Sequence, residues 1–290
     1  MVVLGTSQAS SSNAGESLDG EIELEYRILL GGFSAGSIRL RAAVTPRDYD
    51  LVAWTRSVGA LDLVLGFRSR AASFGTLDGG DPTPRRHMAE NRWMGEARRV
   101  RNDYDPTGRV SNLAIPGAED DDRDPVPPGR QRGTLDPLSA ALKIARAAQG
   151  AEPCRQTIAV FDGRRRYDLM LSPAVRSEIT GPLFKGPARS CEIALRRIVG
   201  FSRNPWLPHA TDLETLRLWF APPAPGLPAI PVRLEADAGL ATVRIDIMAA
   251  RLTAADGGVR FQARVEDWSA SFNDESGPEK TSSPGPEPDR

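Results

Sequence analysis

Apolar and polar residues alternate along most of this chain, a pattern typical of β-strands that bury one face. Residues 21–30, EIELEYRILL, alternate apolar side chains with glutamates, and residues 37–41, SIRLR, alternate Ile38 and Leu40 with arginines. A Gly31-Gly32 pair stands between the two segments, as in a tight turn. The pattern predicts a β-hairpin with one dry face and one solvated face.

Short segments of the same kind recur up to residue 250, and turn residues separate them. Residues 60–67, ALDLVLGF, are ambiguous between helix and loop, and residues 259–267 fit either a last strand or part of a tail. We predict further strands within residues 48–58, 68–77, 84–93, 97–105, 157–161, 166–171, 190–201, 214–222, 230–237 and 241–250.

Residues 157–171, TIAVFDGRRRYDLML, contain three consecutive arginines, which suggest either an anion-binding site or the solvated side of a hairpin. The Asp162-Gly163 pair favours a two-residue type I′ turn, in which Val160 faces Arg165. Arg164 and Arg166 then face the solvent and Arg165 lies near the tip, where its stem can cover the edge of the core, so we prefer the solvated side of a hairpin to an anion site. The dry face of this hairpin would hold Ile158, Val160, Tyr167, Leu169 and Leu171.

One helix, over residues 136–149, has clear start and stop signals. Asp136 is suited to cap the first turn, Pro137 to the first helical position and Gly150 to the position after the end. An apolar stripe predicts that the helix lies against a sheet, with Ser139 off the stripe. The stripe consists of Leu138, Ala141, Leu142 and Ala145.

Many short strands and one well-defined helix favour a mainly β fold: an antiparallel open or partly closed β barrel or sandwich with the helix packed on it. We expect a single β-rich domain over residues 20–255, in two halves joined by an acidic, Pro-rich loop at 116–133 and the helix. Residues 1–19 fit a disordered N-terminus or a signal-peptide remnant, and residues 256–290 fit a last strand followed by a disordered tail.

The charge balance gives no support for a nucleic-acid partner. The 290 residues include 37 Lys and Arg against 38 Asp and Glu, a formal net charge of −1, and 40% hydrophobic residues, as in ordinary soluble domains. No apolar run approaches the ~20 residues that cross a bilayer, so we predict no transmembrane segment.

Catalytic and metal-binding motifs are scarce. The two histidines, His87 in a predicted strand and His209 in a Pro-rich loop, have no second His at metal spacing and no nucleophile motif. The acidic residues 119–122 lack the spacing of a calcium loop. We therefore predict no cofactor, no metal site and no enzymatic activity. A buried cluster of either histidine with a carboxylate and a hydroxyl would instead favour a hydrolase.

Trp54, Phe67 and Trp93 are the candidates for lining an apolar ligand cleft, although aromatic residues more often pack in a core. A large β structure that does not close fully can leave a cavity at its mouth or along its seam. A ligand bordered by these three side chains would be apolar.

Strand alternation points both cysteines, Cys154 and Cys191, toward the dry face of their strands. They are either buried free thiols of a cytoplasmic protein or a disulfide of an exported one. We expect the disulfide, and with it export.

Several segments together resemble the bacterial "domain of unknown function 3108" family. They are RGTLDPLSAAL (132–142), VFDGRRRYDL (160–169) and CEIALRRIVGF (191–201), with further similarity in residues 26–40 and 230–247. Members of that family are mostly exported or envelope proteins of Gram-negative bacteria, mainly antiparallel β, without an established activity. The resemblance therefore implies a β fold and a periplasmic setting, and it carries no catalytic residues. Because the signal peptide is incomplete, we expect a start codon assigned too late rather than a cytoplasmic variant.

These observations lead to two hypotheses of function. The first is a non-enzymatic periplasmic or envelope protein that binds a lipid, lipoprotein or other apolar ligand in an open β barrel. The second is a structural or scaffolding module whose strand edges or Pro-rich loop bind another envelope protein. A continuous apolar cavity would favour the first hypothesis. Only analogy connects the architecture to either.

Overall fold

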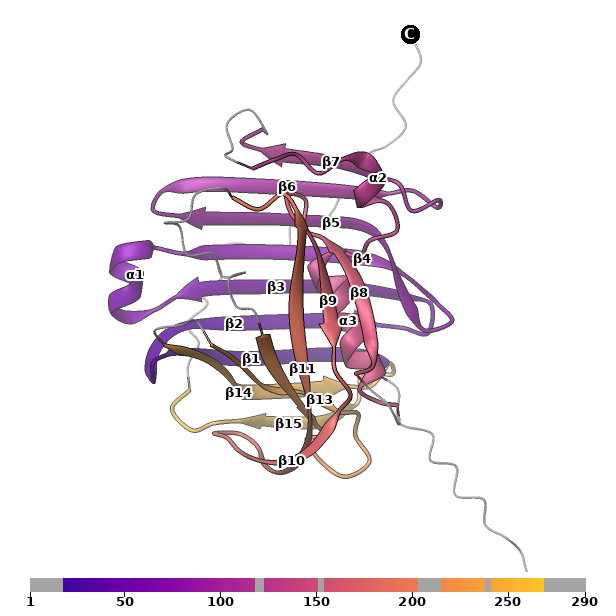
Figure 1. The fold of residues 1–290 in the computed structure, drawn as a ribbon. Helices are drawn as coiled ribbons and strands as arrows, with labels where there is room; N and C mark the ends of the chain where they lie inside the picture. Colours follow the sequence, from indigo (N-terminus) through magenta and orange to yellow (C-terminus); the bar gives the residue numbers. More distant parts are fainter. Residues whose placement is uncertain (1–17, 118–122, 151–153, 203–214, 238–240, 269–290) are drawn as a thin grey trace, which may run out of the picture.

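A computed structural model describes residues 18–117, 123–150, 154–202, 215–237 and 241–268 (Figure 1). The strands are β1 Gly20–Leu30, β2 Phe33–Val44, β3 Asp48–Ser57, β4 Arg68–Asp78, β5 Asp81–Trp93, β6 Glu96–Tyr104, β7 Val110–Ile115, β8 Gln156–Phe161, β9 Arg166–Leu171, β10 Val175–Thr180, β11 Lys185–Val199, β12 Thr215–Ala221, β13 Ile230–Asp237, β14 Thr242–Thr253 and β15 Val259–Arg264. The helices are α1 Gly59–Leu65, α2 Pro128–Gln131 and α3 Pro137–Ala147.

In the described segments, all these strands belong to one sheet with the order β7-β6-β5-β4-β3-β2-β1-β14-β13-β12-β11-β9-β8. Strand β10 pairs with β11, and β15 pairs with β14 beside β13. Neighbouring strands run antiparallel, and the order ends at β7 and β8 without closing. The predicted mainly antiparallel, open β fold with few helices is therefore confirmed.

Strand β1 joins the two halves of the chain. On one side it forms the predicted hairpin with β2, where Leu24 pairs with Leu40. On its other side it pairs with β14 near the C-terminus, where Leu24 faces Ala250. The strands before and after the acidic loop are thus parts of a single continuous sheet.

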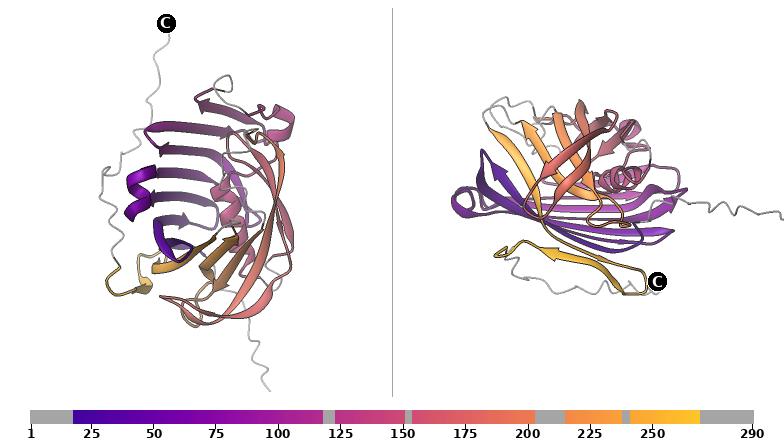
Figure 2. Two further views of the ribbon diagram at one scale, coloured as in Figure 1. Left: turned by 60° about the vertical axis from the view of Figure 1, so that its left-hand side comes forward. Right: turned by 90° about the horizontal axis from the view of Figure 1, so that it is seen from below.

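The sheet curls into two layers that face each other, with α3 between them at one end (Figure 2). Strands β1–β7 form the first layer, and β8, β9, β11, β12 and β13 cross over it. Leu142 of α3 packs with Leu51 of the first layer, and Ile144 packs with Cys191 and Ile193 of the second. We call the facing sides of the two layers the inner face.

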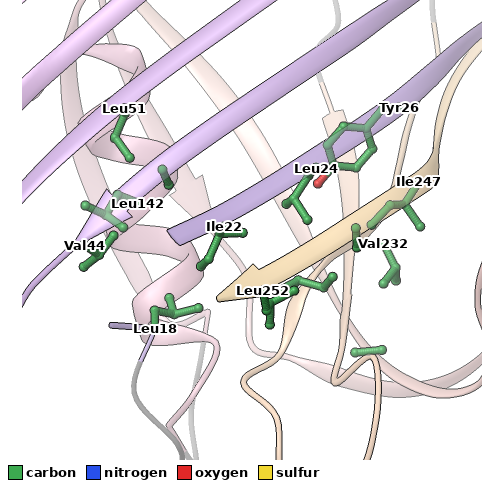
Figure 3. Packing of buried hydrophobic residues seen from close by; sticks show 14 of the residues in the cluster. Leu18, Ile22, Leu24, Tyr26, Val44, Leu51, Leu142, Val232, Ile247 and Leu252 are labelled. Carbon is green, nitrogen blue, oxygen red and sulfur yellow. The ribbon is translucent and has the colours of Figure 1, made fainter. Parts of the chain in front are cut away.

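The core gathers the apolar side of the alternating strands (Figure 3). In β1 the inward residues Ile22, Leu24 and Tyr26 are buried, as the alternation predicts. The hydroxyl of Tyr26 donates a hydrogen bond of 3.0 Å to the carbonyl of Pro231, so that even the polar tip is satisfied. Around them lie Leu18, Val44, Leu51, Leu142, Val232, Ile247 and Leu252.

Helix α3 begins as predicted, with Asp136 as its N-cap and Pro137 in its first turn. The predicted buried stripe is wrong in part, because Ser139 is fully buried and Ala141 is exposed. A helix covered by one sheet buries one stripe, whereas α3 is covered by two layers and buries a wider set of positions. Its buried residues are Ser139, Ala140, Leu142 and Ile144.

The β8–β9 hairpin corrects the predicted turn. Phe161 pairs with Arg166, so the loop has four residues, and Val160 faces Tyr167 rather than Arg165. Asp162 accepts hydrogen bonds from the N–H groups of Arg164 and Arg165, which a four-residue loop allows. Because the register moved by two residues, the inward set remains the predicted one.

Each of the three arginines in this hairpin contacts an acceptor of the chain itself. Arg164 donates to the carbonyl of Pro116, and Arg165 to the carboxylate of Asp162. Arg166 donates to the carboxylate of Asp168. The run is therefore part of the hairpin's own structure.

Two strands were missed by the sequence pattern, β7 and β10, since both are short and mostly exposed. Of the two segments whose pattern was ambiguous, residues 59–65 form α1 and residues 259–264 form β15. His209, the acidic residues 119–122, most of the N-terminal segment and residues 269–290 lie outside the described residues, where their predictions stay predictions.

Candidate functional site

A buried carboxylate, Asp136, is the centre of a polar cluster where α3 meets the first layer. Its Oδ1 accepts the backbone N–H groups of Leu138 and Ser139, each at 3.0 Å, which is an N-cap. Its Oδ2 accepts the hydroxyl of Ser73 at 2.8 Å and that of Ser139 at 2.5 Å. The carboxylate thus joins the helix to strand β4.

Tyr49 and His87 complete this cluster. The hydroxyls of Tyr49 and Ser139 share a hydrogen bond of 2.7 Å, and Nδ1 of His87 lies 3.4 Å from Oδ1 of Asp136. All of these side chains are buried. Burial raises the pKa of Tyr49 far above its ordinary value, and the nearby charge of Asp136 raises it further. The phenol therefore stays neutral and acts as a hydrogen-bonding group.

This cluster contains the groups that would favour a hydrolase: a histidine, a carboxylate and hydroxyls. In a Ser-His-Asp device, the serine donates to the histidine, and the carboxylate orients the histidine. Here the hydroxyls of Ser73 and Ser139 both donate to Asp136 itself. A carboxylate that receives two backbone and two hydroxyl donors is arranged to anchor a helix. We therefore interpret the cluster as the anchor of α3.

Sequence reasoning recognised Asp136 as a helix cap but did not predict its partners. They come from β3, β4 and β5, and only the sheet register places them beside one another. No local signal marked Ser139, because the predicted apolar stripe left this residue off the buried face of the helix.

The predicted disulfide between Cys154 and Cys191 is present. The two Cα atoms are 5.9 Å apart, and both residues are almost completely buried. The bridge ties the segment before β8 to β11, across the intervening β9, and closes a loop of 37 residues. It stabilises the second layer at the point where α3 packs on it.

Beyond α3, small side chains line the inner face of the first layer. Ala53 of β3 pairs with Ala71 of β4, and Ala71 pairs with Ala89 of β5. We call these three residues the alanine row. Each lies two residues along its strand from Leu51, Ser73 or His87, which pair in the same register, so the row and the polar cluster are on the same face of the sheet. They are partly buried rather than fully packed.

The second layer and the adjoining strand β14 present larger apolar side chains on the inner face. Leu218 pairs with Leu234, and Leu234 with Ile245, across β12, β13 and β14. Leu218 also pairs with Cys191, whose packing against α3 shows that this side points inward. We call Leu218, Leu234 and Ile245 the aliphatic row. All three are partly buried.

The three predicted cleft residues lie on two faces of the sheet. Trp54 pairs with Arg39 and Arg70, on the solvated outer face of the first layer. Phe67 and Trp93 continue the strands in which Arg68 pairs with Arg92, and both lie on the inner side at the edge of the sheet. The register thus places Phe67 and Trp93 at the same edge of the sheet and Trp54 on the other face. A ligand role for any of the three stays a prediction.

Other candidate sites are limited. A pocket near the start of β1, lined by Leu18, Ile22 and Leu252 among others, has a volume of about 10 Å³, enough for one water molecule. Among the described residues, no three His, Cys, Asp or Glu side chains gather as metal ligands would. No helix in these segments has the length and apolar character needed to cross a bilayer.

The fold and the inner face define a class: an open, curled antiparallel β protein with a helix between its layers. The chain belongs to the family described as "Protein of unknown function (DUF3108)", whose model matches residues 25–248. This confirms the resemblance seen in the sequence. No curated protein matches the sequence significantly.

Two solved structures are similar in part. One is a "Beta-barrel-like Protein of Domain of Unknown Function DUF1849" from Brucella abortus, at 11% identity and a TM-score of 0.46, covering 80% of this chain and 97% of that one. The other is the hypothetical protein CT021 from Chlamydia trachomatis, at 11% identity and a TM-score of 0.31, covering 82% of this chain and 89% of that one.

Proposed function

We propose that this protein is a non-enzymatic binding protein that holds a lipid or another apolar ligand between its two layers, beside α3. The observation that carries the proposal is the incomplete burial of the inner face away from the helix. Where α3 lies, inward residues such as Ile193 and Val160 are buried. In the alanine row and the aliphatic row, the inward residues are apolar but only partly buried.

Partly buried apolar residues on facing layers are a physical reason to expect a ligand. Apolar surface that stays in contact with water costs roughly 25 cal/mol per Å², and an apolar ligand that covers it recovers this free energy. The alanine row adds room, because each methyl side chain leaves space that a leucine would fill. The aliphatic row spans three neighbouring strands, which is two spacings of about 4.8 Å.

The binding experiment uses a fluorescent fatty-acid probe and a pair of neighbouring substitutions in β4. Ala71→Trp places a large ring on the inner face and is expected to weaken probe binding at least about tenfold, since it occupies the space that the ligand needs. Ala72→Trp places the same ring on the outer face and should bind the probe like the wild type.

Thermal unfolding of both variants checks that each remains folded. Failure of the wild-type protein to bind fatty-acid, phospholipid or lipopeptide probes would contradict the proposal. An equal loss of binding in folded Ala71→Trp and Ala72→Trp would contradict the proposed location.

One observation favours a second function, a scaffolding module that binds another protein by strand addition. Strand β7 ends the hydrogen-bonded order of the sheet, and its Leu113 and Ile115 are exposed. An end strand with exposed apolar side chains is a template for an added strand. A Leu113→Lys substitution should abolish such a complex and leave probe binding intact.

A further inference from the structure

We propose that one edge of the first layer docks onto an anionic lipid surface. The edge contains the β1–β2 turn, helix α1 and the β5–β6 turn, which lie together along one side of the molecule (Figure 1). Its exposed apolar residues, which we call the apolar edge, are Leu30, Phe33, Leu63, Val64, Trp93 and Met94. This inference uses residues other than the proposed ligand site and does not depend on it.

Backbone hydrogen bonds hold the three segments of the edge together. The N–H of Val58, just before α1, donates to the carbonyl of Ala35 in β2 at 3.1 Å. The N–H of Met94 donates to the carbonyl of Leu65 at the end of α1 at 2.9 Å. The apolar edge is therefore one continuous feature made from parts of the chain 60 residues apart.

Helix α1 is unusual because it is apolar and yet buries no side chain. Leu63 is 91% exposed, and Phe33 in the neighbouring turn is 80% exposed. A helix of this length does not persist on its own and needs tertiary support. Exposed apolar residues gathered in this way mark an interaction site.

Hydrogen bonds from Ser57 and Arg68 to the carboxylate of Asp62, which we call the polar hook, provide that support. The carboxylate accepts two hydrogen bonds from the guanidinium of Arg68, at 2.5 and 3.1 Å, and one from the hydroxyl of Ser57 at 2.6 Å. The bonds from Arg68 and Ser57 lower the pKa of Asp62 to about 2, so the hook stays charged at any physiological pH. The apolar side chains of α1 are thus held outward.

The charge beside the edge favours an anionic partner. Arg56 of β3 pairs with Arg68 of β4, and Arg68 pairs with Arg92 of β5, so three arginines form a ladder on the outer face just behind the turns. Segments 56–68 and 90–99 together contain five arginines and three carboxylates, including Asp62, Glu90 and Glu96.

Apolar tips in front of a row of arginines match the two zones of a membrane interface. The apolar side chains would enter the acyl boundary, and the side chains of Arg56 and Arg92 would reach the head groups, since Arg68 is bonded to Asp62. A protein partner or a second copy would cover apolar surface but would not call for this order of apolar residues and cations.

The test is flotation of the full chain with vesicles of phosphatidylglycerol and phosphatidylethanolamine, compared with vesicles of phosphatidylcholine. The wild-type protein should float with the anionic vesicles and only weakly with the neutral ones. A Phe33→Ser, Leu63→Ser variant should lose at least about tenfold in vesicle affinity. The matched control, Val175→Ser with Val259→Ser, removes two residues that are 62% and 50% exposed outside the edge and should bind like the wild type.

Two further measurements decide the geometry. Substituting Arg56 and Arg92 with Gln should remove most of the preference for anionic vesicles, and quenching by brominated lipids should be reduced in a Trp93→Phe variant. No flotation of the wild type, or an equal loss in the edge variant and its control, would overturn the proposal. So would a wild-type dimer in solution that the edge variant dissociates, because a second copy would then cover the edge.

Discussion

Ser73 donates its hydroxyl to Asp136 at 2.8 Å, across 63 residues of sequence. The carboxylate that caps helix α3 is thus held by a strand of the first layer. Because α3 lies between the two layers, this contact helps to fix the position of the helix against the first layer.

Replacing Asp136 with alanine should destabilise the protein by about 3 kcal/mol. The change removes a helix cap, worth about 1 kcal/mol, and leaves buried hydroxyls without their acceptor, at about 1–3 kcal/mol. Urea unfolding measures the effect. The control is Asp256→Ala, whose carboxylate accepts a backbone N–H in an exposed turn. Equal losses in both variants would show that the cluster does not anchor the helix.

Replacing Cys154 and Cys191 with serine should lower the unfolding free energy by about 4 kcal/mol, the chain-entropy value for a loop of 37 residues. The measurement is thermal unfolding of wild type and variant, each with and without reductant. Only the wild type should respond to the reductant. An unchanged melting temperature in the variant under oxidising conditions would contradict the expected role of the bridge.

Glu25 should make the protein sensitive to acid. Burial alone would raise the pKa of this carboxyl, but hydrogen bonds and charges from Arg264 and Arg39, with a bond from Trp268, lower it below its ordinary value of 4.5. The unfolded chain then takes up the proton at a higher pH than the folded one. This stabilisation is therefore complete above about pH 4.5 and is lost as the pH falls through the lower folded value.

Urea unfolding of the wild type and of Glu25→Gln between pH 7 and pH 3 checks this sign. The wild type should be more stable than the variant at pH 7, and the difference should shrink as the pH falls. A constant difference across the range would show that Glu25 keeps its ordinary pKa.

Gly163→Ala should be more destabilising than Gly257→Ala, by about 1–3 kcal/mol. Both glycines have φ near +90°, so alanine costs both backbones a similar amount. A methyl group at residue 163 would lie 2.8 Å from Cβ of Val100, whereas residue 257 has nothing within 4 Å. Chemical denaturation measures the loss of unfolding free energy in each variant. Equal losses would mean that the tip of the β8–β9 hairpin does not pack closely against Val100 of β6.

The sequence pattern predicted local structure correctly wherever one face of a strand is buried. The alternation at Ile22 and Leu24 and the cap at Asp136 correspond to real elements. The inward residues of the β8–β9 hairpin were correct even though its register was wrong, because a shift of two residues keeps every side chain on its face. Each of these features depends only on neighbours in sequence.

What could not be predicted depends on contacts between distant segments. The pairing of β1 with β14 and the second layer over α3 come from such contacts, and they explain why Ser139 is buried. The polar cluster around Asp136 could not be predicted from the sequence for the same reason. Its members look ordinary in sequence, since Ser73 and His87 are single polar residues in their strands. The apolar character of α1 was visible, but not that its side chains point outward.

The central claim is that an apolar ligand binds between the two layers, and mass spectrometry tests it most directly. The protein would be exported to a bacterial periplasm behind a complete signal peptide, purified gently, and measured under native and then denaturing conditions, alongside Ala71→Trp and Ala72→Trp. We predict a native mass above the chain mass for wild type and Ala72→Trp, release of an apolar molecule on denaturation, and a bare chain for Ala71→Trp. A bare wild-type chain that also fails to take up added lipid would contradict the account.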